Sequence, residues 1–395
     1  MNNTVFIVLL TWFLGNMGIH LLTPQLPLFT NTLGINGHYA QMCISLFLLG
    51  KSLGVLVWGP LAEIHGRRPY MLIGLILYGG AALLITLSNH ITEILLLRFV
   101  QGLGVSATVL MGRTIINDCF PEKKAVKAFA LLFTLAGVII ACLPMLGGIL
   151  AQFSNWQSSF YVMSAYAFIV LIFSYYYLPE TIPGSQQILS IKEILTDYGM
   201  VIKHPVFLSY LFISSLMVAG ESAFNTSASF ILIQQHSYSP LSYGTFKTIL
   251  AIAHLLGSAV CAFAIRYTST QLLIGLGVSS FLCASFMMLI FTAMHYSLFS
   301  ALLVPMTIYY FGTGFIVATI SAAIVRPFPQ KMATAMAFCL FLQFLISSCF
   351  SFISSVLNIQ TVAPLATVLM IISILSMVIW LTSVRPHSVI AAEKI

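Results

Sequence analysis

Residues 45–69 read SLFLLGKSLGVLVWGPLAEIHGRRP, a long apolar run that ends in a short polar turn. One charged residue, Lys51, interrupts the run, and two adjacent arginines follow Glu63 in the turn. An apolar helix of about 20 residues is long enough to cross the hydrocarbon layer of a bilayer. The pattern therefore predicts a membrane-spanning helix that ends at a basic membrane face and carries a lysine near its middle.

The whole chain has the same character. Of its 395 residues, 59% are hydrophobic and 6% are charged, and the mean hydropathy is +1.02. Because a soluble domain has about a quarter charged residues, this composition predicts an integral membrane protein. The first span is expected to be retained, since no basic leader or small-residue cleavage site accompanies it. The apolar runs predict twelve spans, at residues 5–23, 40–61, 70–88, 93–116, 126–151, 157–178, 206–234, 242–265, 270–294, 297–325, 332–356 and 362–382.

The distribution of Lys and Arg predicts the orientation. Twelve of the sixteen lie in alternate connections or in the C-terminal tail, and the connections on the other side carry none. By the positive-inside rule, both termini are expected in the cytoplasm, for a protein of a bacterial inner membrane. The net charge of +7 follows from this topology and does not predict nucleic-acid binding. The twelve are Arg67, Arg68, Lys123, Lys124, Lys127, Lys192, Lys203, Arg266, Arg326, Lys331, Arg385 and Lys394.

The seven cysteines lie nearly all within spans and have neither CxxC nor other paired spacing. They predict no disulfide framework and no metal site. No cofactor is expected. The sequence contains no Ser/His/Asp set and no phosphate-cradling loop, so an enzyme is not predicted.

The spans fall into two halves of six. The pattern of residues 5–178 recurs about 200 residues later, and the long polar segment 178–205 separates the two copies. Apolar residues at helical spacing from Ile188 to Tyr198 predict a short amphipathic helix on the inner membrane surface. The predicted divisions are a bundle at 1–184, a linker at 185–204 and a second bundle at 205–395. Two such bundles are the architecture of many secondary transporters.

Several motifs make the resemblance specific, and together they span the chain in register. GPLAEIHGRRP (59–69) resembles the G-x-L-A-D-R-x-G-R-R signature of the major facilitator superfamily, and RFVQGLG (98–104) resembles its R-x-x-Q-G-x-G motif. ACLPMLGG (141–148) resembles the antiporter motif of span five. TPQLP (23–27) fits the span-one pattern P-x-x-P, and LPET (178–181) is a common close to span six. RPFPQKMATAMAF (326–338) resembles a stretch of the Bcr/CflA group of drug-efflux proteins, in the drug:proton antiporter branch. The resemblance implies an all-α fold of twelve transmembrane helices in two six-helix bundles.

The signature turn has two interpretations. Its glycines allow a tight turn, and its arginines bind anionic headgroups. The resemblance implies that Glu63 gates transport by pairing with a charge of the neighbouring bundle, whereas the simpler alternative is a charged loop. Glu63 replaces the usual Asp, and Ile64 replaces the usual basic residue. The gating set is Gly59, Glu63, Gly66, Arg67, Arg68, Arg113 and Asp118, of which the last two are expected either to link the inner end of span four to the turn or to lie in solvent.

In the span-five motif, Pro144 is expected to bend the helix, and Gly147 and Gly148 allow another helix to approach closely. The resemblance implies a bend that controls bundle packing in exporters. Generic membrane packing is the alternative.

Ionisable residues inside the spans are the candidate substrate and proton site. A charge at a helix centre costs roughly 2.5 to 3.5 kcal/mol, so such residues usually face a polar path. Lys51 and Glu221 are both near the midplane, and Glu221 is the only acidic residue at that depth. Structural roles are open for several members, since Lys247 can extend outward, Arg98 can brace span one, and a histidine can simply pack. The set is Glu221, Lys51, His20, Arg98, Lys247, His254 and Asn225.

His20 stands where Bcr/CflA-like proteins usually carry Asp. Lys51 stands where they typically place an aromatic residue. We expect Lys51 either to pair with Glu221 or to act as counter-ion for an anionic substrate, with both arrangements possible in different states.

Three function classes follow. The first is a proton-driven exporter of a small molecule, either drug-like or an acidic or zwitterionic metabolite such as a carboxylate siderophore. The second is an importer or exchanger of an organic anion, and the third is a membrane protein that does not transport. We expect a monomer whose partners are its substrate, protons and lipid.

The topology is tested by labelling a cysteine introduced at Ser185, in a background without the seven native cysteines. We expect a membrane-impermeant thiol reagent to leave this cysteine unlabelled in intact cells and to label it in inverted vesicles. Efficient labelling of intact cells would refute the orientation.

Overall fold

The computed structural model describes residues 3–120, 122–181, 191–324, 327–328 and 332–384, which form helices and connections with no strand among them. Within this part of the chain, eleven helices are long and apolar enough to cross a membrane. Residues Ile140–Phe153 of α6 form a shorter apolar helix in the place of the twelfth. Each predicted span therefore corresponds to a helix, and the all-α membrane fold is confirmed.

The elements are α1 (Asn3–His20), the 3₁₀ turn η1 (Thr23–Gln25), α2 (Leu26–Leu33), α3 (Gly37–His65), α4 (Arg67–Leu87), α5 (Ile91–Cys119), α6 (Glu122–Phe153), α7 (Ser158–Tyr177), α8 (Ile191–Ile202), α9 (Pro205–Ser229), the π-helix η2 (Phe230–Gln235), α10 (Pro240–Ala264), α11 (Thr270–Ala293), α12 (Leu298–Ala323), α13 (Met332–Val356), α14 (Val362–Ile379) and the π-helix η3 (Trp380–Val384).

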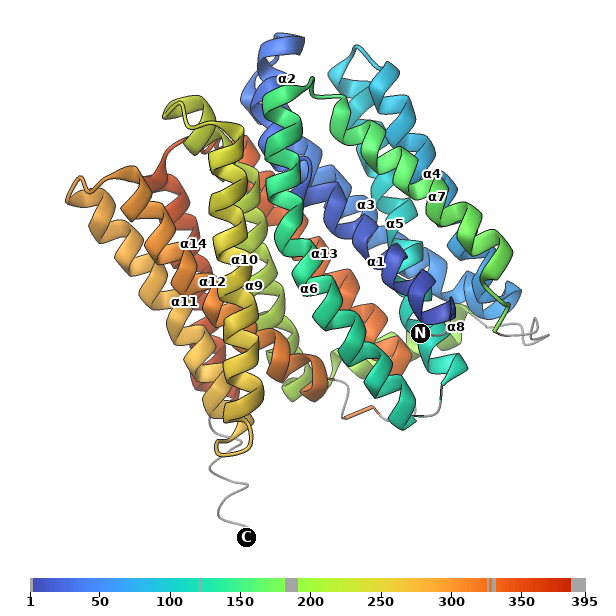
Figure 1. The fold of residues 1–395 in the computed structure, drawn as a ribbon. Coiled ribbons are helices and arrows are strands. Elements are labelled where there is room, and N and C mark those ends of the chain that lie inside the picture. The colour runs from blue at the N-terminus through green and yellow to red at the C-terminus, as the bar shows by residue number, and fades with distance from the viewer. Residues whose placement is uncertain (1–2, 121, 182–190, 325–326, 329–331, 385–395) are drawn as a thin grey trace.

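The core separates into two main clusters of buried apolar residues. One is built almost entirely from α1 to α7, and the other almost entirely from α9 to α14. Figure 1 shows the two groups of helices side by side, with α6 and α13 near the middle. Ala337 and Leu340 of α13 belong to the first cluster, so this helix packs on both halves.

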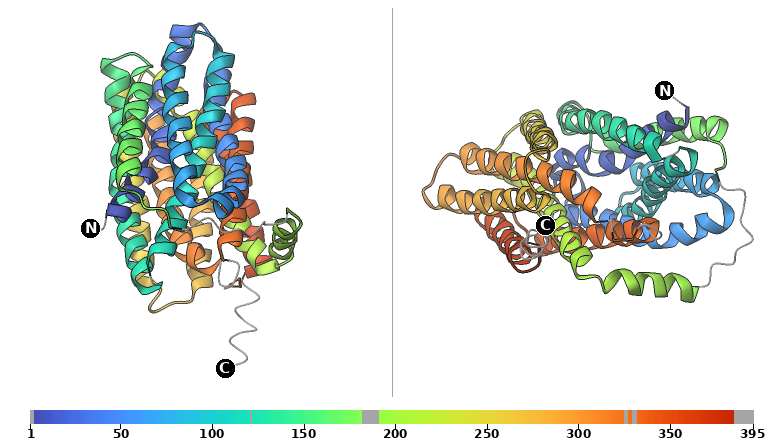
Figure 2. Two further views of the ribbon diagram at one scale, coloured as in Figure 1. Left: turned by 90° about the vertical axis from the view of Figure 1, so that its right-hand side faces the viewer. Right: turned by 90° about the horizontal axis from the view of Figure 1, so that it is seen from below.

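The predicted linker helix is present as α8, which lies beside the lower ends of the bundles (Figure 2). Its Tyr198 packs against Phe338 of α13, with ring centroids 5.7 Å apart. The linker residues 185–190, with Ile188, lie outside the described part of the chain. The predicted division at residues 184 and 204 stays a prediction.

The first span is longer than predicted. Residues Thr4–Leu33 form one apolar segment of 30 residues, in which α1 passes through η1 into α2. Pro24 and Pro27 do not end it, because each lies in the first turn of a new helical segment, where a backbone N–H is not needed. Gly34, in the left-handed conformation with φ of +63°, caps the end of α2.

Serine hydroxyls join the two halves where α3 lies along α13. Hydrogen bonds between membrane helices contribute only about 0.6 kcal/mol on average. A row of weak bonds holds the halves together without locking them. The bonds join Ser45 Oγ to Ser351 Oγ (2.8 Å), Ser348 Oγ to the Ser45 carbonyl (2.8 Å), Ser355 Oγ to the His38 carbonyl (2.8 Å) and Ser52 Oγ to the Phe341 carbonyl (2.9 Å).

Glycines bring α6 and α10 into backbone contact, which forms the second seam between the halves. A Cβ on Gly148 would lie 2.4 Å from the carbonyl oxygen of Pro240, and one on Gly244 would lie 2.6 Å from that of Pro144. The Thr248 hydroxyl donates to a backbone carbonyl of α6 at 2.8 Å. No larger residue fits at either glycine without moving a backbone.

Gly148→Ala therefore overpacks this seam, and we expect it to destabilise the protein by about 1 to 3 kcal/mol. The measurement is the thermal unfolding midpoint of the purified protein in detergent. Gly80→Ala is the matched control, because a Cβ on Gly80 meets nothing within 4 Å. Equal midpoints for the two variants would mean that α6 and α10 do not meet at Gly148.

Candidate functional site

The signature turn is held by a carboxylate that the sequence did not single out. Gly66 separates α3 from α4 with a φ of +97°, a conformation that favours glycine. The Glu180 carboxylate accepts from the backbone N–H groups of Arg67 (2.8 Å) and Arg68 (3.1 Å). It thereby caps the N-terminus of α4, where backbone N–H groups lack partners within the helix. A Cβ on Gly66 would lie 2.5 Å from this carboxylate.

Asp118 links α5 to the turn. This was one of the two predicted alternatives, the other being a place in solvent. Its carboxylate lies 3.4 Å from Arg67 Nε and accepts from the Thr181 hydroxyl at 3.1 Å. Arg68 donates to the Tyr175 carbonyl at 2.5 Å. The turn and the ends of α5 and α7 thus form one network within the first half.

Two expectations for the gating set are wrong. Gly59 does not form the turn, because α3 continues through it to His65, and a Cβ there would be 3.7 Å from Leu110. Arg113 neither links to the turn nor lies in solvent. Its Nη1 donates to the Met336 sulfur of α13 at 3.2 Å, and its guanidinium lies 5.1 Å from the ring of Trp12.

Glu63 is close enough to the linker helix α8 to act on it electrostatically. Burial and the Glu63 carboxylate both raise the pKa of the Tyr198 hydroxyl of α8, with burial the larger cause. Arg67 and Asp118 also act on Glu63 electrostatically. Among the described residues, no salt bridge joins Glu63 to a cation of the second half. Its gating role stays a prediction.

The span-five motif lies at a junction of three helices. Pro144 and Gly148 meet α10, as described for the second seam. A Cβ on Gly147 would lie 2.5 Å from the carbonyl oxygen of Leu21, at the end of α1. The close approach explains both glycines, and their role in export stays a prediction.

Arg98 of α5 has a bracing position. It is fully buried, and it donates from Nε to the Cys43 carbonyl of α3 at 3.1 Å and from Nη2 to the Gly18 carbonyl of α1 at 2.7 Å. Its Nη1 donates to the Gln101 side chain. These three bonds tie three helices together.

In the second half, Lys247 forms the centre of a polar cluster. The side chain is 2% exposed, and its Nζ donates to Asn225 Oδ1 at 2.5 Å and to the Tyr310 hydroxyl at 2.9 Å. The rings of Phe224 and Tyr310 lie 4.7 and 5.0 Å from the same Nζ. Lys247 therefore does not extend outward, as the sequence allowed, but points into the bundle.

Glu221 and His254 belong to the same cluster. Glu221 is half-buried near the middle of the span Pro205–Gln235, and it interacts electrostatically with Lys247 and Thr313. His254 Nδ1 lies 2.7 Å from the Thr313 hydroxyl. α9, α10 and α12 thus bring one carboxylate, one ammonium and one imidazole together.

Lys51 lies in the first half and is not paired with Glu221, so that alternative is not formed in this structure. The lysine is the middle residue of α3, and its Nζ lies 4.1 Å from the ring centroid of Phe344 on α13. Both Lys247 and Lys51 are close enough to His20 to act on it electrostatically. Its Nδ1 is buried without a hydrogen-bond partner.

Sequence reasoning missed Tyr310, Thr313 and Phe344. The first two belong to the polar string YYFGTG in the middle of α12, which is a usable signal. Phe344 has no comparable signal, because an aromatic residue in an apolar helix is ordinary.

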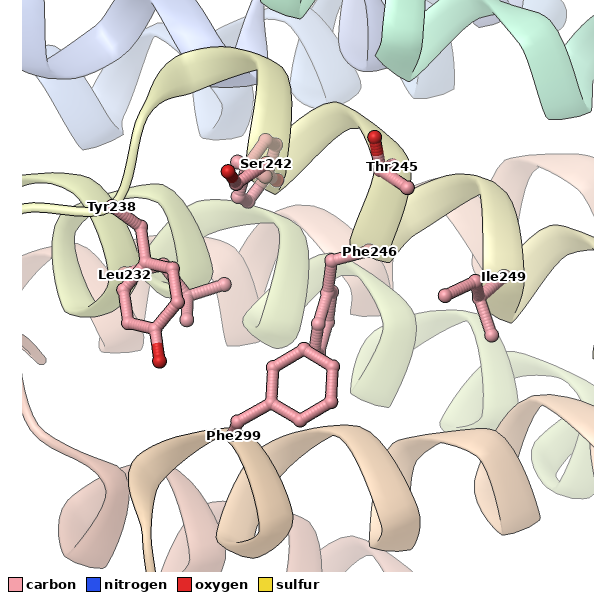
Figure 3. A pocket seen from close by; sticks show the side chains of 8 residues that line it. Leu232, Tyr238, Ser242, Thr245, Phe246, Ile249 and Phe299 are labelled. Atoms are coloured by element: carbon pink, nitrogen blue, oxygen red, sulfur yellow. The ribbon is translucent and has the colours of Figure 1, made fainter.

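A pocket of about 260 Å³ opens on the outer side of this cluster, between η2, α10 and α12. Phe246 and Phe299 line it, as Figure 3 shows, and their ring centroids are 6.4 Å apart. Phe246 also stacks on Phe224, whose ring lies against Lys247. The rings of Phe246 and Phe224 therefore lie between this pocket and the buried ammonium of Lys247.

The Glu180 cap yields a stability test. We expect Glu180→Ala to destabilise the protein by about 0.5 to 2 kcal/mol, the usual loss for a helix N-cap. Glu180→Gln keeps one acceptor oxygen and should lose less. The measurement is the thermal unfolding midpoint of each variant. An unchanged midpoint for Glu180→Ala would show that the cap does not stabilise α4.

Known proteins resemble the chain along nearly its whole length. It is 24% identical to the uncharacterised MFS-type transporter YdgK of Bacillus subtilis, over 92% of the chain and 90% of that protein. It is 28% identical to the bicyclomycin resistance protein homolog of Haemophilus influenzae, over 62% of each. The multidrug resistance protein MdtL of Klebsiella pneumoniae is 23% identical, over 94% of the chain and 93% of that protein.

Solved structures of other transporters have the same fold. The crystal structure of a D-xylose–proton symporter superposes with a TM-score of 0.78 at 12% identity, covering 96% of the chain and 97% of that protein. Residues 5–352 match the Major Facilitator Superfamily. The chain belongs to the Major Facilitator Superfamily of membrane transporters, with relatives that include a bicyclomycin resistance protein homolog and a multidrug resistance protein.

Proposed function

We propose that the protein is a proton-coupled exporter that works by alternating access. The observation that carries the proposal is Glu221, the one carboxylate near the middle of a span, beside the buried ammonium of Lys247. A polar ionisable group at that depth usually serves transport, since a purely structural role does not offset its desolvation.

Protonation of Glu221 changes the charge of this cluster by one unit. Lys247 keeps its hydrogen bonds to Asn225 and Tyr310 in either case, but it loses the opposing charge. A proton can drive the transport cycle only if it binds the two conformations with different affinity. The two weak seams between the halves, the serine row of α3 and α13 and the glycine contacts of α6 and α10, are the contacts that such a change would break and remake.

The cation excess supports an acidic or zwitterionic substrate. Lys51, Arg98, Arg113 and Lys247 lie within the described spans, and Glu221 is the one carboxylate near the middle of any of them. Drug-like compounds of this charge and carboxylate siderophores belong to that class. The names of the multidrug and bicyclomycin-resistance relatives support export of a drug-like molecule.

The same cation excess favours a second candidate, an importer or exchanger of an organic anion. The two candidates differ in the direction of net flux and in the need for a proton gradient. We also propose that the protein is a monomer in a bacterial inner membrane, with both termini in the cytoplasm.

Glu221→Gln tests the coupling. In inverted vesicles energised with a proton gradient, we expect the variant to lose uphill accumulation of substrate while it retains downhill exchange. Glu93→Gln is the control, because Glu93 is an exposed carboxylate in the first turn of α5. Uphill accumulation at the unaltered rate in Glu221→Gln would rule out Glu221 as the proton site, and exchange without any gradient dependence in the unaltered protein would favour the exchanger.

A further inference from the structure

Two cations of the first half converge on one face of α1. Lys51 Nζ lies 3.3 Å from the position that a Cβ on Gly15 would take. The Arg113 guanidinium lies 5.1 Å from the ring centroid of Trp12. Residues 12 and 15 are three apart on one helix and therefore neighbours on its surface. Arg113 is also close enough to act on the Lys51 ammonium electrostatically.

Both cations have weak partners. Lys51 is 8% exposed and meets the face of Phe344, while Arg113 donates to the sulfur of Met336 and has a buried Nε with no partner. A ring face attracts a cation by about 0.5 to 2 kcal/mol, and a thioether is a weak acceptor. Among the described residues, no salt bridge joins either cation to a carboxylate.

Arg98 shows the contrast within the same bundle. Its guanidinium donates to two backbone carbonyls and one side-chain oxygen, so its donors are used by the protein itself. Two adjacent cations without a counter-ion in an apolar interior are unfavourable. Within the part of the chain that the structure describes, no carboxylate neutralises Lys51 and Arg113.

We propose that Lys51 and Arg113 form an anion subsite that binds the carboxylate of an organic substrate. Phe344 and Trp12 flank the two cations, so the subsite suits a carboxylate attached to an apolar or aromatic body. The proposal rests on the proposed transport function and adds the location of the substrate charge. It places that charge in the first half, apart from the Glu221 cluster of the second half.

The position of Phe344 and Met336 gives the subsite a mechanical consequence. Both belong to α13, the helix that packs on α3 along the serine row. A carboxylate that takes their place beside Lys51 and Arg113 displaces α13 side chains from the first half. Substrate binding thus acts directly on the seam that must open during the cycle.

The test is binding of benzoate to the purified full-length protein in detergent at low salt. The probes are benzoate, isophthalate and the neutral isostere benzamide, and the readouts are the thermal midpoint and the dissociation constant. We expect benzoate and isophthalate to raise the thermal unfolding midpoint saturably and benzamide to leave it unchanged. Lys51→Gln and Arg113→Gln should each weaken carboxylate binding at least about tenfold, the loss expected for one charge-assisted hydrogen bond.

Controls separate loss of charge from loss of fold. Lys203→Gln removes an exposed cation outside the spans and should bind benzoate like the unaltered protein. Lys51→Arg and Arg113→Lys keep the charge but change the geometry of the donors, so each should bind benzoate more tightly than the corresponding glutamine variant. Ligand-free Lys51→Gln and Arg113→Gln should have thermal midpoints at least as high as the unaltered protein, since each removes a buried charge without a counter-ion.

Three results would overturn the subsite. These are no response of the unaltered protein to either carboxylate, equal binding after removal of both charges, or loss of binding only in Lys247→Gln. A different result would refute the proposed transport function and leave the subsite intact. In that case the vesicles show no proton-driven flux, although benzoate binding still depends on Lys51 and Arg113.

Discussion

An ionised side chain inside the hydrocarbon layer needs a partner, and the organisation of this protein follows from how each cation finds one. Arg98 donates to carbonyls of α1 and α3 and to a side chain of its own helix, so it acts as a structural tie. Lys247 has an amide and a phenol as partners and a carboxylate nearby. Lys51 and Arg113 have a ring and a sulfur. The partners thus become fewer and weaker from Arg98 to Lys247 and then to Lys51 and Arg113. Arg98 braces the helices, and the other three belong to the proposed proton and substrate sites.

The contacts between helices differ between the interior of the first half and the boundary of the two halves. Within the first half, glycines allow α3 and α5 to touch through their backbones, since a Cβ on Gly50 or Gly102 would lie 2.1 Å from a carbonyl oxygen of the other helix. Between the halves, the α3–α13 contact includes serine hydroxyls that make hydrogen bonds of small individual free energy. The α3–α13 contact between the halves is thus less tightly packed than the α3–α5 contact within the first half, whereas α6 and α10 meet across the halves through their backbones.

The end of the first half that carries the signature turn has a separate network of contacts. Glu180 caps α4, and Asp118 binds Arg67, so the signature turn is fixed to the ends of α5 and α7. Glu63 is close enough to α8, the helix between the halves, to act on Tyr198 electrostatically.

The sequence by itself determined the twelve spans and the family, because a bilayer accepts only long apolar helices and the motifs lie at their ends. It also marked Glu221, Lys51 and Lys247 as buried ions. It could not assign their partners. Arg113 was expected either to link α5 to the signature turn or to lie in solvent, yet it packs on Trp12 and Met336. Pairing with Glu221 was one expectation for Lys51, but its ammonium lies instead against the ring of Phe344. Span position fixes depth, whereas the rotation and packing of each helix decide which side chains meet, and only the tertiary structure sets those.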